Sequence, residues 1–146
     1  MKPAILIFTF SFFFLVISCK PKSEPVDYGS DSCHYCKMTI VSKQFASELV
    51  TQKGRVYKFD AIECMVHQLA EDAETPMGLY LIHDYLNGSD DFVDATKAYY
   101  LISEDIQSPM GAHLAGFKEL HQAEQFKEKN GGEIFTWEEL QAKIKH

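Results

Sequence analysis

Apolar and polar residues alternate in short blocks once the chain has passed its first thirty residues. Residues 45–51 and 55–59 each alternate as a half-buried strand does, and the Lys53–Gly54 pair between them is typical of a turn, so the two segments predict a β-hairpin. Over residues 61–73 the apolar spacing changes to that of an amphipathic helix, and residues 78–85 are again rich in strand-forming residues. The first half therefore predicts a ββαβ unit.

The second half of the chain repeats this order of elements. Its predicted segments are extended stretches at 92–94 and 98–102, a turn at 108–111, an extended stretch at 112–117, a helix at 118–129 with Leu120, Ala123 and Phe126 facing inward, and a strand at 133–135. Gly131 and Gly132 end that helix, and Thr136 caps a last helix at 137–145. The predicted fold class is α+β, with tandem duplicated ββαβ units whose antiparallel sheets are each backed by a helix.

The predicted helix of the first unit begins with a capping pattern. Asp60 stands directly before the helix and Glu63 follows three residues later, which is the spacing of a capping box. The same two acids could serve general acid–base chemistry, but the sequence lacks a nucleophile elbow, a phosphate-binding glycine loop and an HExxH motif. We therefore expect capping, and we expect no enzymatic activity.

The first eighteen residues are typical of a lipoprotein signal peptide. Lys2 supplies a positive charge and residues 5–17 are almost all apolar, a run too short to span a membrane comfortably. Ser18–Cys19 then resembles a lipobox, in which the sulfur of Cys19 carries lipid and several acyl chains give stable anchoring. The alternative is an ordinary secretory leader. We expect a chain anchored in a bacterial cell envelope and facing the periplasm or the exterior. Lys20 stands in place of the Asp that often retains lipoproteins at the inner membrane, which favours the outer membrane.

Residues 19–31 predict a flexible tether, because they combine prolines, serines and alternating charges with little to bury. Residues 32–146 then form one folded domain. The chain carries a formal net charge of −7, and removing residues 1–18, which hold one lysine and no acid, makes it −8. An acidic body argues against nucleic-acid binding and favours a cationic ligand or a basic partner surface.

A hexapeptide early in the predicted domain carries the candidate chemistry. Residues 33–38, Cys-His-Tyr-Cys-Lys-Met, place two thiols and a thioether close together, and such soft ligands select Cu(I) over hard cations. If this segment is extended, Cys36 and Met38 point to the same side. Met110, in a Pro-Met-Gly turn where a partner could reach it, is a second candidate thioether. The sequence thus predicts a Cu(I) site built by sulfur atoms from both units.

Four features carry a resemblance to a known family. They are Cys33-x-Tyr35-Cys36-x-Met38, Phe59–Asp60 at the start of a helix, Ser108-Pro109-Met110-Gly111, and Asn130-Gly131-Gly132. Together, over about residues 33–136, they resemble the NosL family of copper-binding lipoproteins, which are accessory proteins of nitrous oxide reductase in denitrification. The resemblance implies a tandem ββαβ fold and delivery of Cu(I) to a membrane-associated assembly complex and on to the copper centres of the reductase.

The resemblance also implies the metal ligands, which are Cys33, Cys36, Met38 and Met110. Cys64 and Met65 lie on the apolar face of the predicted first helix, where core packing explains both of them. They also add soft atoms, so that Cys64 leaves open a site different from the family's. His113 follows the Met110 turn closely enough to be a weaker candidate ligand, as Cys64 is.

Two other functions fit the cysteines. With Cys19 expected to carry lipid, three cysteines remain, and an exported Cys33–Cys36 pair oxidises readily. The chain could therefore be a periplasmic thiol-disulfide oxidoreductase that uses Cys33 and Cys36, or a structural or adhesive lipoprotein with an incidental Cys-x-x-Cys motif. A thioredoxin-like site lies where a strand meets a helix, whereas this pair precedes a stretch at 39–41 that is predicted to be extended. That position favours the copper carrier.

Overall fold

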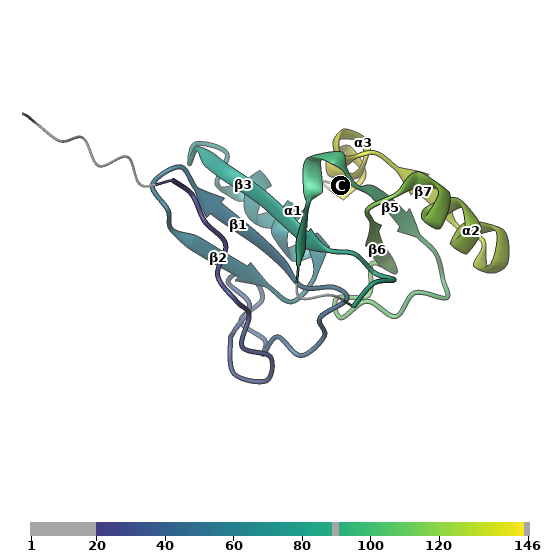
Figure 1. Cartoon of the computed structure of the whole chain (residues 1–146), viewed down its shortest axis with the longest axis horizontal. Coiled ribbons are helices and arrows are strands. Elements are labelled where there is room, and N and C mark those ends of the chain that lie inside the picture. Colours follow the sequence, from purple (N-terminus) through teal and green to yellow (C-terminus); the bar gives the residue numbers. More distant parts are fainter. Residues whose placement is uncertain (1–19, 89–90, 145–146) are drawn as a thin grey trace, which may run out of the picture.

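The computed structural model describes residues 20–88 and 91–144, which form two antiparallel sheets and their helices (Figure 1). The predicted signal peptide of residues 1–18 and the predicted lipid attachment at Cys19 lie outside the described residues. Within the described part of the chain, no helix is both long enough and apolar enough to cross a membrane.

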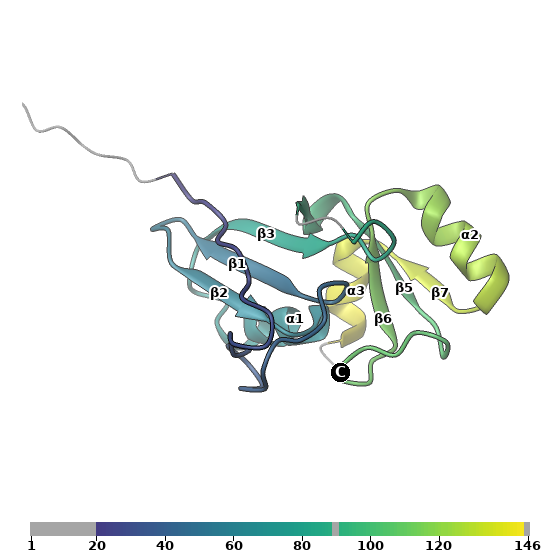
Figure 2. The same ribbon diagram turned by 60° about the horizontal axis from the view of Figure 1, so that its bottom comes forward.

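The first sheet has four strands in the order β2-β1-β3-β4. Their bounds are Ser47–Thr51 for β1, Val56–Phe59 for β2, Met77–His83 for β3 and Phe92–Asp94 for β4. Helix α1, Ile62–Glu71, connects β2 to β3 and packs on β1 and β2 (Figure 2). It does so because its apolar stripe, which includes Ile62, Met65 and Val66, is buried.

The second sheet has three strands in the order β6-β5-β7. The elements of this half are a short 3₁₀ turn at Ala95–Lys97, β5 at Tyr99–Ile102, β6 at Leu114–Phe117, α2 at Leu120–Asn130, β7 at Glu133–Phe135 and α3 at Trp137–Ile144. In each unit the first strand lies between the second and the third, as β2-β1-β3 and as β6-β5-β7, and every pair is antiparallel. This shared topology confirms the predicted α+β fold with two ββαβ units.

Helix α2 differs from the prediction at its start. Ala123 is buried and Phe126 is half-buried, as predicted, but Leu120 is 40% exposed. The reason is that α2 packs on its sheet through Ala123 and leaves its first turn to solvent. The predicted glycine stop is confirmed, because Gly131 ends α2 with a φ of 73°, a left-handed value that glycine adopts without strain.

Helix α3 lies between the two units and packs against α1 and β5 (Figure 2). One hydrophobic cluster runs through both units. It includes Phe59 and Met65 of the first unit, Tyr100 and Leu114 of the second, and Trp137 of α3. Because the units share this core, each holds the other in place.

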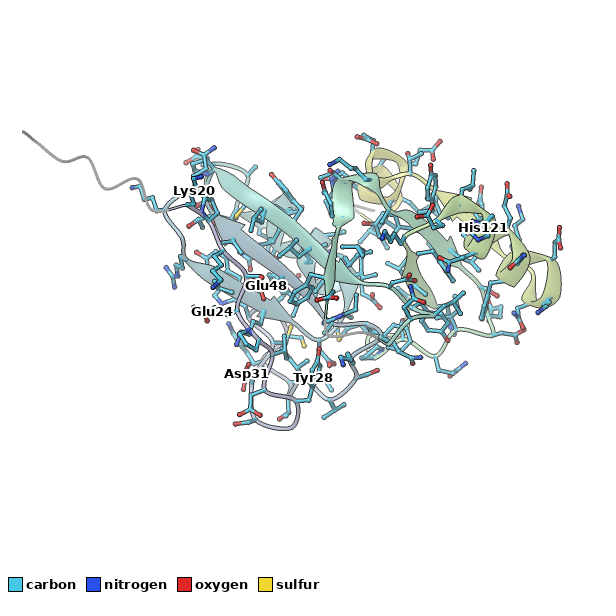
Figure 3. All side chains as sticks on the ribbon, viewed as in Figure 1. Lys20, Glu24, Tyr28, Asp31, Glu48 and His121 are labelled. Atoms are coloured by element: carbon cyan, nitrogen blue, oxygen red, sulfur yellow. The ribbon has the colours of Figure 1, made fainter. Side chains whose placement is uncertain are left out.

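An N-terminal strap, residues 20–26, crosses the first sheet on the face opposite α1 (Figures 1 and 3). The backbone N–H of Glu24 donates a hydrogen bond to Oε1 of Glu48 on β1 at 3.1 Å. Nζ of Lys58 on β2 donates to the carbonyl oxygen of Pro25 at 2.7 Å. With α1 on one face and the strap on the other, all five residues of β1 are buried.

The strap also contacts β3. Pro21 lies so close to Gly78 that a Cβ atom at position 78 would overlap its ring. Farther along, the carboxylate of Asp31 pairs with Nζ of Lys58 at 2.7 Å. Of the stretch predicted as a tether, residues 20–31 thus have partners on the sheet that the composition does not reveal.

Of the two side-chain caps predicted at helix starts, the one at α3 forms and the one at α1 does not. At α3 the cap is confirmed, because the N–H of Glu139 donates to Oγ1 of Thr136 at 3.4 Å and the N–H of Thr136 donates to Oε2 of Glu139 at 2.8 Å. At α1 the predicted cap by Asp60 and Glu63 is wrong, since the helix starts after Ala61 with no side-chain cap. Both acids are buried and accept hydrogen bonds from distant residues instead.

Candidate metal centre

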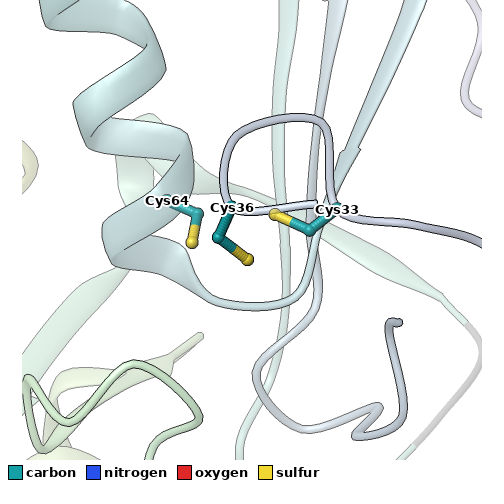
Figure 4. A group of neighbouring side chains, drawn as sticks. All are labelled: Cys33, Cys36 and Cys64. Carbon is teal, nitrogen blue, oxygen red and sulfur yellow. The ribbon is translucent and has the colours of Figure 1, made fainter. Parts of the chain in front are cut away.

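Two cysteines of one short loop, Cys33 and Cys36, meet the distant Cys64 at the start of α1 (Figure 4). The sulfur atoms of Cys33, Cys36 and Cys64 all lie within 4.8 Å of one another, and all three are free thiols. Among the described residues they are the one group of Cys, His, Asp or Glu side chains close enough to share a metal ion. We call this group the thiol cluster.

The loop that carries Cys33 and Cys36 reverses direction within a few residues. The N–H of Cys33 donates to the carbonyl oxygen of Met38 at 2.7 Å, and the N–H of Lys37 donates to the carbonyl oxygen of Cys33 at 3.0 Å. Lys37 adopts a left-handed φ of 66°, which closes the turn. Because Cys36 lies in a turn and not in an extended segment, the expected alternation does not apply to Cys36 and Met38.

Backbone contacts hold this loop over the first sheet. The N–H of His34 donates to the carbonyl oxygen of Lys58 on β2 at 2.8 Å. At the base of the loop, Ser32 and Thr39 form an isolated antiparallel bridge. The loop is therefore fixed beside the end of β2, where the chain enters α1 and places Cys64 in the first turn of that helix.

The thiol cluster stabilises a negative charge on Cys33. The thiol of Cys64 donates a hydrogen bond to the sulfur of Cys33, and the backbone N–H groups of Asp60 and Cys36 also donate to it. These bonds lower the pKa of Cys33 to about 5, although burial opposes ionisation. The lowered pKa favours the thiolate form of Cys33, which is the form that binds metal ions.

Cys36 and Cys64 keep their protons beside this charge. Burial is the main cause that raises the pKa of Cys36, and the negative Cys33 adds to it. The hydrogen bond to Cys33 is the main cause that raises the pKa of Cys64, followed by burial. A soft cation would replace both protons, because it supplies the positive charge that additional thiolates need.

Solvent reaches the thiol cluster from the side of Cys36, which is half-buried, whereas the other two cysteines are fully buried. The neighbouring Tyr35 is fixed along α1. Its ring stacks on His67 with the ring centroids 5.4 Å apart, and its hydroxyl donates to Oε1 of Glu71 at 3.0 Å. Cys36 is therefore the most accessible sulfur of the thiol cluster.

The two candidate thioethers lie at the surface, with Met38 53% exposed and Met110 41% exposed. The turn that carries Met110 is bonded to α1, since Oγ of Ser108 donates to Oε1 of Glu63 at 2.9 Å. Glu63 directly precedes Cys64, so this turn is tied to the helix beside the thiol cluster. Ligation of a metal by either methionine stays a prediction.

His113, the weaker candidate ligand, does not join the thiol cluster. Its Nδ1 lies 2.8 Å from the carbonyl oxygen of Ile106, and its φ is 55°. Met65 is fully buried in the core, as its helical spacing suggests. A role for His113 as a metal ligand stays a prediction, without support from a contact to the thiols.

The sequence marks Cys64 only as a weaker candidate ligand, and it does not predict that Cys64 joins Cys33 and Cys36 or that Glu63 bonds to the Met110 turn. The spacing of Cys64 fits the core stripe of α1 as well as it fits a ligand, so periodicity cannot separate the two roles. The sequence feature that favours a ligand role for Cys64 is its place in the first turn of a helix that follows a half-buried strand. For Glu63 the chain offers no such signal, because its partner Ser108 is 45 residues away.

Three comparisons with known proteins point to one family. The sequence profile of the NosL family matches residues 27–144. The copper-binding lipoprotein NosL of Stutzerimonas stutzeri is 30% identical over 125 residues, which cover 80% of this chain and 66% of that protein, so this chain spans slightly less than two thirds of its length. The crystal structure of the copper chaperone NosL from Shewanella denitrificans superposes with a TM-score of 0.70 and 25% identity, over 82% of this chain and 96% of that one. From the extent of these matches, the chain belongs to the NosL family.

Proposed function

We propose that this protein is an exported, lipid-anchored carrier of Cu(I) and not an enzyme. The thiol cluster is the observation that supports this most strongly, because it gathers three sulfur atoms within 4.8 Å of one another, and its hydrogen bonds lower the pKa of Cys33. Thiolates are soft ligands that select Cu(I). The two relatives are named for copper binding and as a copper chaperone, which supports the same metal here.

Three sulfur ligands suit Cu(I) better than Zn²⁺. Structural zinc sites close a tetrahedron with four Cys, His or carboxylate ligands. Among the described residues, no fourth side chain of those types joins the thiol cluster. Cu(I) accepts low coordination numbers from sulfur, and a thioether can complete its coordination without adding negative charge. Met110 or Met38 would supply that thioether.

A carrier must release its metal as well as hold it. The fully buried Cys33 and Cys64 would retain Cu(I), while the half-buried Cys36 and the exposed Met38 and Met110 would pass it to ligands of a partner. The partner we propose is a membrane-associated complex that assembles the copper centres of nitrous oxide reductase. Lipid on Cys19 would keep the carrier at the membrane where that complex works.

A thiol-disulfide oxidoreductase is the second candidate, and the low pKa of Cys33 is the observation that favours it. A redox-active thiolate attacks a disulfide of another protein directly, so its sulfur must be accessible. Cys33 is fully buried, and its charge is shared with neighbouring thiols rather than presented to solvent. These facts favour the carrier.

An anaerobic Cu(I) titration against a chromogenic chelator tests the proposal. We expect the wild type to bind Cu(I) through its thiols, and we expect Cys33→Ser and Cys64→Ser to bind it about tenfold more weakly or worse, since each loses a thiolate ligand. Met77→Leu is the matched control, because Met77 is a buried sulfur residue of the same core on β3. Its copper affinity should equal that of the wild type.

Unchanged affinity in Cys64→Ser would contradict the three-sulfur site. The oxidoreductase would be favoured instead by disulfide reductase activity that needs both Cys33 and Cys36 and survives Met110→Ala.

A further inference from the structure

We infer that Glu63 is a positioning residue, whose buried carboxylate holds the Met110 turn against the start of α1 so that the thioether of Met110 and the thiol of Cys64 serve one metal ion. The inference rests on the proposed copper binding. It adds Glu63 as the residue that links the Met110 turn of the second unit to the thiol cluster of the first.

The carboxylate of Glu63 bonds to both sides of the turn. Its Oε1 accepts hydrogen bonds from Oγ of Ser108 at 2.9 Å and from the backbone N–H of Ala112 at 3.4 Å. Met110 stands midway between these two residues, and two steps along a chain span at most about 7 Å between Cα atoms. Both ends of the turn are therefore clamped, and Met110 stays near the helix.

The helix fixes the position of Glu63 relative to the thiol cluster. Glu63 and Cys64 are consecutive residues in the first turn of α1, and Ile62 and Cys64 are buried in the core. The backbone of a packed helical turn has little freedom, so the offset between the carboxylate and the thiol is constant. The clamp therefore sets the place of Met110 relative to Cys64.

Other polar contacts of this loop remain within the second unit. Nδ1 of His113 lies 2.8 Å from the carbonyl oxygen of Ile106, and the N–H of Ser103 donates to the carbonyl oxygen of His113 at 3.0 Å. Such contacts shape the loop but do not locate it relative to the thiols. The hydrogen bonds to Glu63 cross from the second unit to the first and do locate it.

The burial of Glu63 argues for a role other than stability. The side chain is 3% exposed, and its Oε2 has no hydrogen-bond partner within the described part of the chain. Burying a carboxylate with one oxygen unsatisfied destabilises a fold, and an apolar side chain would fill the position at lower cost. Such a violation of packing rules is typical of a residue that serves a site.

Methyl NMR of the protein labelled at its methionine methyl groups tests the inference, with Met110→Leu used to assign the Met110 signal. In the wild type, Cu(I) added under anaerobic conditions should shift the Met110 methyl resonance. In Glu63→Leu the thiols should still take up Cu(I), but the Met110 methyl should keep its metal-free position and the affinity should fall about tenfold. Glu63→Gln keeps an acceptor oxygen and should restore the shift.

Two further variants complete the design. Ser108→Ala removes the shorter hydrogen bond without altering α1, so it should show a reduced shift even where Glu63→Leu fails to fold. Glu124→Leu, an exposed acid on α2, is the matched control and should behave as the wild type. Without copper, the amide of Met110 should be more mobile in Glu63→Leu and Ser108→Ala than in the wild type, because the clamp is weakened.

The inference is overturned if Met110 shifts fully in Glu63→Leu and Ser108→Ala, or if its amide mobility is unchanged in both. It is also overturned if the wild type binds Cu(I) while the Met110 methyl does not respond. A wild type that takes up no Cu(I) at all, with no thiolate-to-copper absorption, refutes the proposed function instead. In that case, the amide mobility of Met110 in the metal-free variants still tests whether Glu63 holds the turn.

Discussion

Cys33 owes its charge to groups that come from three places in the chain. The thiol of Cys64 and the N–H groups of Asp60 and Cys36 all donate to its sulfur. Each donor lies on a segment that is fixed by the core or by the tight loop, so the thiolate is solvated by the protein in place of water. The thiol cluster is thus prepared for a soft cation before one binds.

Removing the Cys64 thiol should move the pKa of Cys33 upward. In Cys64→Ala the strongest donor to Cys33 is lost, and we expect its pKa to rise from about 5 toward the ordinary thiol value of about 8.5. The ultraviolet absorbance of the thiolate, followed from acid to alkaline pH in metal-free protein, measures the change. Met65→Leu, the next position on α1, is the control, and an unchanged pKa in Cys64→Ala would count against the hydrogen bond.

A candidate site residue can be predicted from the sequence when its partners are close to it along the chain. Cys33 and Cys36 were found because two thiols and a thioether within one short loop have few structural uses. The place of Cys64 in the thiol cluster is not predictable in this way, because a single thiol on an apolar helical stripe has an ordinary use in packing. Glu63 was misread because its partners lie across the fold, where sequence spacing carries no information.

At the scale of elements, the packing of β6 on the first unit fixes one half of the molecule against the other. Gly116 on β6 faces Cδ1 of Ile82 on β3 and Cδ1 of Ile62 on α1. A Cβ atom at this position would overlap the first of these and would come within 3.2 Å of the second. The absence of a side chain at Gly116 therefore lets the strand lie directly on α1 and β3.

Gly116→Ala should destabilise the fold by about 1 to 3 kcal/mol, because the added methyl group must displace packed side chains or separate the two units. Denaturation with guanidinium chloride measures the free energy of unfolding. Ala73→Ser, an exposed change in the turn after α1, should leave it within about 0.5 kcal/mol. If Gly116→Ala were as stable as the wild type, the neighbouring isoleucine side chains would have to move aside without loss of packing energy.

Most strands and helices are predictable because the spacing of apolar residues within a short segment indicates which of the two forms. Helix caps show where that local information ends. Thr136 and Glu139 sit at an exposed helix start, so the local cap forms. Asp60 and Glu63 have a similar spacing but are buried, and there Val41 and Ser108 compete successfully for their carboxylates.

At the scale of the whole molecule, the strap makes stability depend on pH through Glu48. This residue is fully buried on β1 under the strap, where its Oε1 accepts a hydrogen bond from the N–H of Glu24. Burial raises the pKa of Glu48 to about 7, against the opposing effects of that N–H and of the charge on Lys58. The folded protein therefore holds a proton on Glu48 at pH values where the unfolded chain has released it.

The sign of the effect follows from the raised pKa. Between about pH 4.5 and 7 the folded state binds more protons than the unfolded state, so stability should fall as pH rises through this window and level off above it. Glu48→Gln lacks this titration and should exceed the wild type in stability by on the order of 1 to 3 kcal/mol above pH 7, with the difference vanishing toward pH 4.5. Denaturation curves across this range measure it.

The comparison with the variant is needed because burial also raises the pKa values of Asp60 and Glu63. Those groups titrate in both proteins and cancel in the difference. A gap between Glu48→Gln and the wild type that stays constant with pH would contradict the assignment to Glu48.

If Cys19 carries lipid as proposed, the contacts of the strap with the sheet also set how far the folded body can lie from the bilayer. If residues 20–31 were fully extended and free of the sheet, they would form a tether about 40 Å long between the lipid and the folded body. Because Pro21 already contacts β3, Lys20 is the one residue between that contact and position 19, where lipid is proposed to be attached. On the proposed function, a body held so close to the membrane would reach the proteins that receive its copper by lateral and rotational diffusion in the plane of the bilayer.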